Sequence, residues 1–279
     1  MIRWRDLLLL VAITTVLVGC GETRSANVTT SSTPTIPTTA LTNSEWPSVY
    51  SDAAALAGRR VDLRGRVYSD PTFNKEGMVF SAWVDFDNDQ LSTTFRVAGV
   101  TAGIEKDDFV WVLGRVVDVA VLAGANGDDP LVEVEQLTVT DRVGVRPAER
   151  ILNVRQALEH NGVRVMLERV EFADEEVRIY VAVENRGQEV LRAFGTGLRI
   201  ELGDAHISAV IPVGKGVSPP RGLVEPGVTE SGGFQFPAFD PKDGSFVVRW
   251  INLGFESDRE SPERWVWLVD PSGTIRPEG

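Results

Sequence analysis

Residues 59–69 read RRVDLRGRVYS, and residues 78–86 read MVFSAWVDF. In both stretches every second side chain is apolar, as in a β-strand with one buried face. Three further runs rich in β-branched residues follow, at 92–97, 109–122 and 131–140. Clusters of Asp, Asn, Gly and Pro separate the runs, and such clusters mark turns. Five short strands of this kind favour a small closed barrel.

The segments AGRRVDLRGRV (57–67) and KDDFVWVLGRVVDV (106–119), with an aromatic strand between them, resemble an OB-fold of the kind found in bacterial surface proteins. The resemblance implies a five-stranded OB-like barrel over 46–146, and the alanines within 48–57 predict a short helix before it. OB barrels often bind oligonucleotides or oligosaccharides on the face around their second and third strands. The outward side chains that could form such a ligand face are Arg64, Arg66, Tyr68, Trp83 and Arg96. The acidic surroundings favour a plainer interpretation, in which these side chains cover the barrel and pack against the second half.

The second half, 147–279, also consists of short alternating runs. Asn161-Gly162 is a strong two-residue hairpin signal between 151–159 and 163–172. Further runs follow at 177–183, 198–202, 207–211, 233–236, 246–251 and 265–269. Short strands with Gly and Pro turns predict an antiparallel sandwich, in which Trp250, Trp265 and Trp267 are expected to be core or sheet-edge residues.

Three strings in this half, GVRVMLERVEF, EEVRIYVAVENRG and LVEPGVTESGGFQFPAF, resemble an Ig-like module common in bacterial lipoproteins of unknown function. The resemblance implies an extracytoplasmic β-sandwich and no catalytic residues. The expected fold class is therefore all-β, a barrel followed by an Ig-like sandwich. We expect 46–146 and 147–279 each to fold as a separate unit.

The N-terminus has the pattern of an export signal. Arg3 and Arg5 precede an apolar run over 7–18, within the range of signal peptides and too short to span a bilayer. The run ends in Leu17-Val18-Gly19-Cys20, which resembles the bacterial lipobox. The resemblance implies a signal peptide over 1–19, lipidation of Cys20, and anchoring at the outer face of the cell membrane.

Residues 20–45 are dominated by Thr, Ser and Pro. Because such a segment buries little apolar surface, we expect a flexible tether that could carry glycans on its hydroxyl groups. Beyond the tether both halves are acidic: 46–146 has 10 basic and 16 acidic residues, and 147–279 has 15 and 21. This charge argues against tight binding to nucleic acid. We expect no nucleic-acid partner.

The chain offers few groups for metal or cofactor chemistry. It has one cysteine and two histidines, His160 and His206, so an intrachain disulfide is impossible and the composition disfavours a Cys/His metal site. The spacing of Asp85, Asp87 and Asp89 begins a calcium loop, but Gln90 replaces the turn glycine and Arg96 the closing Glu. An acidic hairpin turn is favoured over a calcium site, and we expect no cofactor.

We therefore expect a lipid-anchored binding or scaffolding protein without catalytic activity, with an envelope protein or glycan as partner. One alternative is a surface receptor that binds an anionic polymer or oligosaccharide on the barrel face. A second is a hydrolase with an unrecognised site. The motifs G-x-S-x-G and H-E-x-x-H do not occur, and the two histidines are expected in surface loops.

Overall fold

The computed structural model describes residues 39–99, 103–117, 129–212, 214–241, 244–255, 265–271 and 275–276. These residues all belong to one compact unit, 37–279. Cys20, the signal segment 1–19 and tether residues 20–38 lie outside the described residues, as do residues 118–122 of the strand expected at 109–122.

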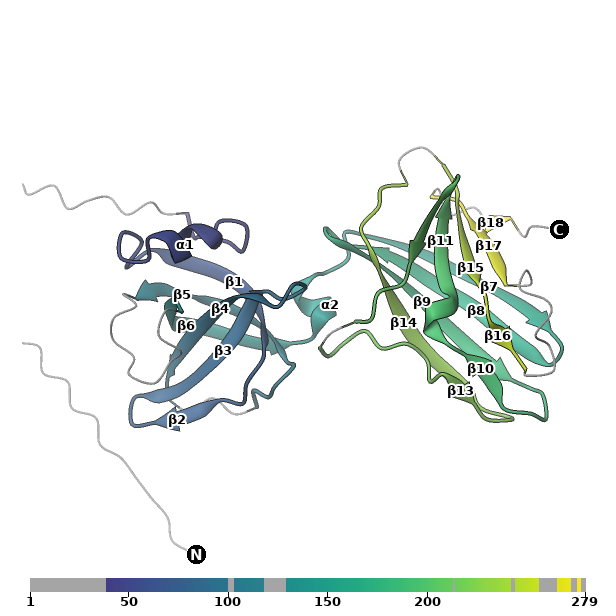
Figure 1. The fold of residues 1–279 in the computed structure, drawn as a ribbon, viewed down its shortest axis with the longest axis horizontal. Helices are drawn as coiled ribbons and strands as arrows, with labels where there is room; N and C mark the ends of the chain where they lie inside the picture. The colour runs from purple at the N-terminus through teal and green to yellow at the C-terminus, as the bar shows by residue number, and fades with distance from the viewer. Residues whose placement is uncertain are drawn as a thin grey trace, which may run out of the picture. The chain divides into compact units, whose positions relative to one another are not determined.

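The prediction of an all-β fold, a barrel followed by an antiparallel sandwich, is confirmed (Figure 1). The first part of the chain contains a short helix, five barrel strands and one small edge strand. They are α1 (Pro47–Ser51), β1 (Arg60–Val67), β2 (Thr72–Asn74), β3 (Gly77–Asp85), β4 (Gln90–Ala98), β5 (Phe109–Val117) and β6 (Leu131–Thr140).

The barrel strands are ordered β1-β3-β4-β6-β5, and β1 pairs with both β3 and β5, so the sheet closes on itself. The pairing of β4 with β6 is parallel, and the others are antiparallel. This is the strand order of an OB-fold. The alternate side chains recognised in the sequence fill the interior, including Val61, Leu63 and Phe80.

The prediction of a helix over 48–57 is wrong in its length. The helix α1 ends at Ser51. The Asp52 carboxylate accepts a hydrogen bond from the backbone N–H of Ala55, at 3.0 Å. This local bond holds the alanine run in turns, since Asp side chains compete with helical hydrogen bonds.

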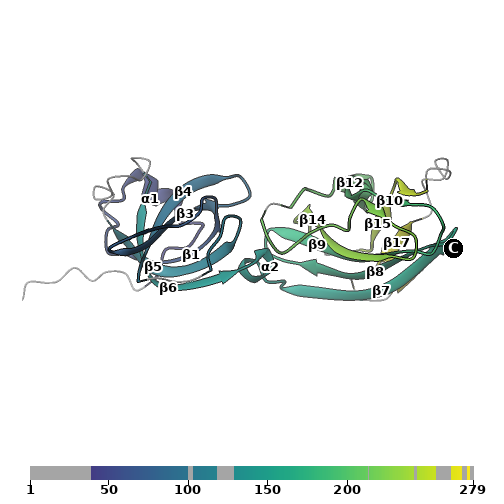
Figure 2. The same cartoon turned by 90° about the horizontal axis from the view of Figure 1, so that it is seen from below.

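The second part begins at a one-turn helix, α2 (Arg142–Val145), and continues into antiparallel sheets (Figure 2). One sheet has the order β14-β9-β8-β7, from β7 (Arg150–His160), β8 (Val163–Phe172), β9 (Glu176–Asn185) and β14 (Thr229–Pro237). The other has the order β12-β11-β15-β17-β18, from β11 (Leu198–Leu202), β12 (Ala205–Ser208), β15 (Phe246–Trp250), β17 (Val266–Val269) and β18 (Ile275–Arg276). A small sheet is formed by β10 (Leu191–Ala193), β13 (Leu223–Val224) and β16 (Leu253–Gly254), and η2 (Gly195–Gly197) is a 3-10 turn.

One hydrophobic core is shared by these sheets, and Trp250, Trp265 and Trp267 are buried in it, as predicted. The Asn-Gly hairpin is also confirmed. Asn161 and Gly162 have φ values of 46° and 77°, and these positive values are those of a type I′ turn. The turn pairs His160 with Val163 across β7 and β8. Among the described residues, no helix is long and apolar enough to cross a membrane.

Candidate functional site

Three of the five residues predicted for the ligand face lie together on the barrel. Arg66 is the cross-strand partner of Trp83, and the Trp83 ring stacks on Tyr68 with ring centroids 4.3 Å apart. The Tyr68 hydroxyl lies 2.8 Å from the hydroxyl of Ser92. Trp83 also packs against the buried pair Phe86 and Phe109.

Arg66 makes its contacts within the protein. Its side chain is only 7% exposed and forms ion pairs with Asp89 and, at 3.1 Å, with Asp107. Gly214, from the loop between β12 and β13, covers it so closely that a Cβ at Gly214 would lie 3.0 Å from the Arg66 Cδ. The guanidinium is therefore neutralised and covered, which disfavours a role in binding an anionic polymer.

Arg64 stands two positions before Arg66 on β1, on the same side of the strand, and Arg96 lies on β4. The Arg64 guanidinium lies 5.3 Å from the ring centroid of Trp111, its partner on β5. Arg96 is four positions along β4 from Ser92, the partner of Trp83, which is a separation of about 13 Å along a strand. Arg96 therefore lies apart from the stacked pair Tyr68 and Trp83.

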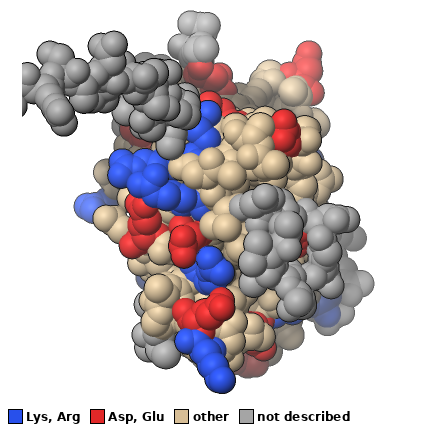
Figure 3. Space-filling model, turned by 90° about the vertical axis from the view of Figure 1, so that its left-hand side faces the viewer, with Lys and Arg blue, Asp and Glu red and all other residues tan. Residues whose placement is uncertain are grey.

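Arg96 lies in a shallow hollow of about 310 Å³ with Glu76, Ala98 and Glu133. Its guanidinium is 3.6 Å from Glu76 and 3.4 Å from Glu133, so the two carboxylates outnumber the one cation. Figure 3 shows that basic and acidic side chains are interspersed on the face it presents. Such a surface provides no extended basic groove for a polyanion.

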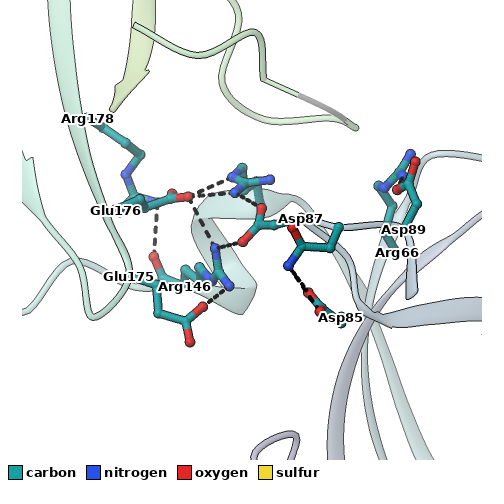
Figure 4. Close-up of polar contacts among 10 residues, drawn as sticks. Arg66, Asp85, Asp87, Asp89, Arg146, Glu175, Glu176 and Arg178 are labelled. Atoms are coloured by element: carbon teal, nitrogen blue, oxygen red, sulfur yellow. Dashed lines mark hydrogen bonds and ion pairs between the residues drawn. The ribbon is translucent and has the colours of Figure 1, made fainter. Parts of the chain in front are cut away.

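The acidic segment between β3 and β4 is a hairpin turn, as predicted, and each of its carboxylates has a protein partner. Asp85 accepts hydrogen bonds from the Asn88 amide at 3.1 Å. Asp87 pairs with Arg142 and Arg146, and Asp89 pairs with Arg66 (Figure 4). Within the described residues no group of three or more His, Cys, Asp or Glu is arranged to hold a metal ion.

The densest polar cluster surrounds α2. This short helix is capped by Asp141, whose carboxylate accepts a hydrogen bond from the Gly144 N–H at 2.9 Å. Arg142, 1% exposed, donates from Nε to Glu176 at 2.8 Å and from Nη2 to Asp87. It therefore links the β3–β4 turn to the first residue of β9. We call the set Asp87, Arg142, Arg146, Glu176 and Arg178 the α2 joint.

Two further arginines surround Glu176, as Figure 4 shows. Arg146 lies 3.6 Å from Glu176 and also pairs with Asp87 and Glu175. Arg178, fully buried, donates from Nη1 to Glu176 at 3.2 Å and to the Arg146 carbonyl at 2.9 Å. Glu176 is itself 1% exposed, so its charge is held by three guanidinium groups in a site closed to solvent.

The aromatic side of the joint is formed by the barrel. The Arg146 guanidinium lies 4.4 Å from the ring centroid of Phe86, and Arg142 lies 5.6 and 5.9 Å from those of Phe86 and Phe109. Arginine over an aromatic face adds a favourable electrostatic contact. Val145 of α2 packs with the same two phenylalanines.

Neighbouring charges shift the pKa of Asp87, the carboxylate that the β3–β4 turn contributes to the α2 joint. Burial alone would raise the pKa of Asp87, but hydrogen bonds and charges from Arg142 and Arg146 outweigh burial and lower it. Burial opposes the charge on Arg142, but Glu176 and Asp87 together raise its pKa. Asp87 and Arg142 are therefore both ionised at neutral pH.

A second contact lies beside the joint. Lys215, in the β12–β13 loop, extends its ammonium to Asp108 at 2.7 Å and to Glu105 at 3.0 Å. Its carbonyl accepts a hydrogen bond from the Arg142 N–H at 2.9 Å, and its own N–H donates to the Asp107 carbonyl at 3.2 Å. The loop therefore joins residues just before β5 to α2.

Both histidines lie on strands. His160 is the last residue of β7, and His206 is the second residue of β12. The prediction that both lie in surface loops is therefore wrong, although each stands within one residue of a strand end. The nearest carboxylate recorded for His206 is that of Glu201, at 3.9 Å.

Sequence reasoning missed the α2 joint. Arg142 and Glu176 are 34 residues apart in the sequence, and Asp87 and Arg142 are 55 apart. A periodic pattern along the sequence does not report contacts at such separations. The sequence carried no signal of this buried charge, because Arg178 alternates with Val177 and Ile179 as an outward polar residue would. The structure shows that both faces of β9 are buried, so Arg178 needs a partner.

The comparisons with known proteins give only distant likenesses. No family model and no curated protein sequence matches the chain. Among solved structures, a candidate lipoprotein of Bacillus subtilis (ycdA) has a TM-score of 0.35 and 15% identity over 42% of this chain and 38% of its own length. The yjhA protein of the same species has a TM-score of 0.32 and 13% identity, over 42% of this chain and 96% of its own.

A functionally unknown protein from Listeria monocytogenes has a TM-score of 0.29 and 7% identity, over 36% of this chain and 72% of its own. The chain thus spans well under half of the first of these structures. Because all three TM-scores lie below 0.5, these likenesses assign no function to the chain.

Proposed function

We propose that the chain is a lipid-anchored extracytoplasmic scaffolding or binding lipoprotein without catalytic activity, which presents its barrel and its Ig-like sandwich to one envelope partner. The lipobox ending at Cys20 supports the anchor. The α2 joint supports the scaffold, and it is the observation that carries the proposal.

The joint supports a scaffold because of where its charges lie. Arg142 is buried between Asp87, in the β3–β4 turn of the barrel, and Glu176, at the start of β9. Separating these groups would leave buried charges unpaired, which is strongly unfavourable. Two modules held together bind a common partner with less loss of conformational freedom than two that move separately.

The rival proposal of a receptor on the barrel face has less support. Arg66 is engaged by two carboxylates, and Tyr68 and Trp83 stack on each other. The hydrolase alternative has no described cluster in its favour.

Photo-crosslinking of the anchored protein in its native membrane tests the scaffold. The crosslinker is placed singly at exposed barrel positions, Phe73 and Trp111, and at exposed sandwich positions, Ile211 and Leu223. The proposal predicts that at least one barrel position and one sandwich position capture the same envelope partner. Matched variants at the buried positions Leu63 and Ile200 should capture none.

Capture from one module only would overturn the scaffold and favour a receptor with a single binding face. The Cys20→Ser variant is the control for anchoring. If it captured the same partner at the same yield after release into the medium, the lipid anchor would have no part in the function.

A further inference from the structure

Two different interactions close the barrel along β1: pairing with β3 at one end, and pairing with the segment before α1 at the other. At one end β1 pairs with β3, through Arg66 with Trp83 and Val67 with Ala82. Gly65 allows this approach, because a Cβ there would lie only 3.2 Å from the Ala82 Cβ and the Trp83 carbonyl oxygen. Between Arg60 and Gly65 no pairing of β1 with β3 is recorded.

Residues preceding α1 fill this part of the barrel. The Leu41 N–H donates to the Arg60 carbonyl at 2.9 Å, and the Asp62 N–H donates to the Leu41 carbonyl at 2.8 Å. Leu41 is thereby paired in parallel with Val61. Its side chain is buried in the barrel core, so it contributes both backbone pairing and apolar contact.

Asn43 bridges the two strands where their backbones are not paired. Its Nδ2 donates to the Arg64 carbonyl at 2.7 Å and to the Val84 carbonyl at 2.9 Å. Its Oδ1 accepts from the Arg64 N–H at 2.8 Å. One side-chain amide thus satisfies three backbone groups of β1 and β3, which would otherwise lack partners.

Trp46 completes the segment. It is fully buried in the barrel core, and its indole N–H donates to the Thr93 hydroxyl of β4 at 2.8 Å. Residues 41–46 therefore contact β1, β3 and β4, although the sequence places 41–45 in a Ser/Thr-rich stretch.

We propose that residues 41–46 form a strap that completes the barrel and cannot detach unless the barrel opens. The strap is the point where the chain leaves the barrel toward Cys20. If the lipid anchor of the proposed function is correct, tension on the anchor reaches β1 through the strap, because Leu41 is hydrogen-bonded to Arg60 and Asp62.

Native-state hydrogen exchange of the unlipidated chain tests the strap independently of the anchor. The amides of Asp62 and Arg64 are bonded to the strap, whereas that of Val112 lies in β5 between two paired strands. The proposal predicts that all three exchange with the same protection factor, set by opening of the whole barrel. Protection of Asp62 and Arg64 at least tenfold below that of Val112 would show that the strap detaches alone, and would overturn the proposal.

Paired variants test the role of Asn43. Asn43→Ala removes three hydrogen bonds and should lower the protection of Asp62 and Val112 together, by roughly 30-fold or more. Asp62 is the reporter because its acceptor, the Leu41 carbonyl, is kept in the variant, whereas Arg64 loses its own acceptor. The control, Thr42→Ala, removes only the hydroxyl contacts to Ser44 and Glu45 and should leave both amides unchanged. A loss of protection confined to Asp62 would contradict the proposal. If Asn43→Ala fails to fold, the comparison of wild-type amides still decides the matter.

Discussion

Replacing Glu176 by Gln is the substitution that most directly perturbs the α2 joint. Gln keeps the shape of the side chain but removes a negative charge that lies within hydrogen-bond distance of Arg142 and Arg178. Both guanidinium groups are at most 1% exposed, so water cannot replace the lost charge. Arg142 then keeps Asp87 as its one carboxylate partner.

The expected cost follows from this burial. Removing one partner of a buried ion pair typically costs about 3–5 kcal/mol, because the remaining charge is left without compensation. For a unit of about 240 residues, 1 kcal/mol corresponds to about 2–4 °C in Tm. Glu176→Gln should therefore lower the Tm by about 6–20 °C.

Urea denaturation and scanning calorimetry of the unlipidated chain measure both quantities. The matched control is Glu175→Gln, the adjacent residue, whose 62% exposed carboxylate also pairs with an arginine of the joint, Arg146. An exposed pair contributes only about 0–1 kcal/mol. If the two variants lose equal stability, the burial of the joint is not what makes it stabilising, and the reasoning is refuted.

Four further outcomes are expected. Cys20→Ser should release the protein from the membrane or leave it unprocessed, and a free, unacylated cysteine in the wild-type N-terminal peptide by mass spectrometry would contradict the anchor. A fragment of residues 39–146 should unfold at higher urea concentration than 46–146, because only the longer one contains strap residues 41–45; equal midpoints would count against the strap. Since the pKa of Asp87 is lowered in the folded state, its ionised form adds stability above the unfolded pKa of 3.8 that is lost as pH falls through the folded value. Asp87→Asn should therefore flatten the loss of stability below about pH 4, measured by urea titration across pH, and an unchanged acid slope would be inconsistent with the pairs at Asp87. Binding to single-stranded DNA at physiological salt should be no tighter than roughly 10 μM, and sub-micromolar binding that disappears in Trp83→Ala would restore the barrel face as the functional site.

The barrel and the sandwich could be predicted because strands and tight turns each have a characteristic local pattern of residues in the sequence. The alternation in 59–69 and 78–86 reports which side chains face the core, and Asn161-Gly162 encodes the positive φ values of its turn. The strap could not be predicted in this way. Leu41 and Asn43 stand in a stretch whose composition is that of a tether, and their partners on β1 are recognised only when the barrel is formed.

The candidate site shows the same limit more strongly. The sequence placed Arg64, Arg66 and Arg96 on one outward face, because parity along a strand indicates the side a residue faces but not its neighbours. In the structure each of the three has different partners. The charges that matter for the α2 joint come from a turn, a one-turn helix and a strand end, and only the tertiary fold brings them together.

We propose that the α2 joint makes the barrel and the sandwich move as one body. Measurement of ¹⁵N relaxation on the unlipidated chain tests it directly, because two flexibly linked modules tumble at different rates. We predict a single rotational correlation time for amides of the barrel strands and of the sandwich strands, and a separation of the two values in Glu176→Gln. A shorter correlation time for the barrel than for the sandwich in the wild-type protein would contradict the claim.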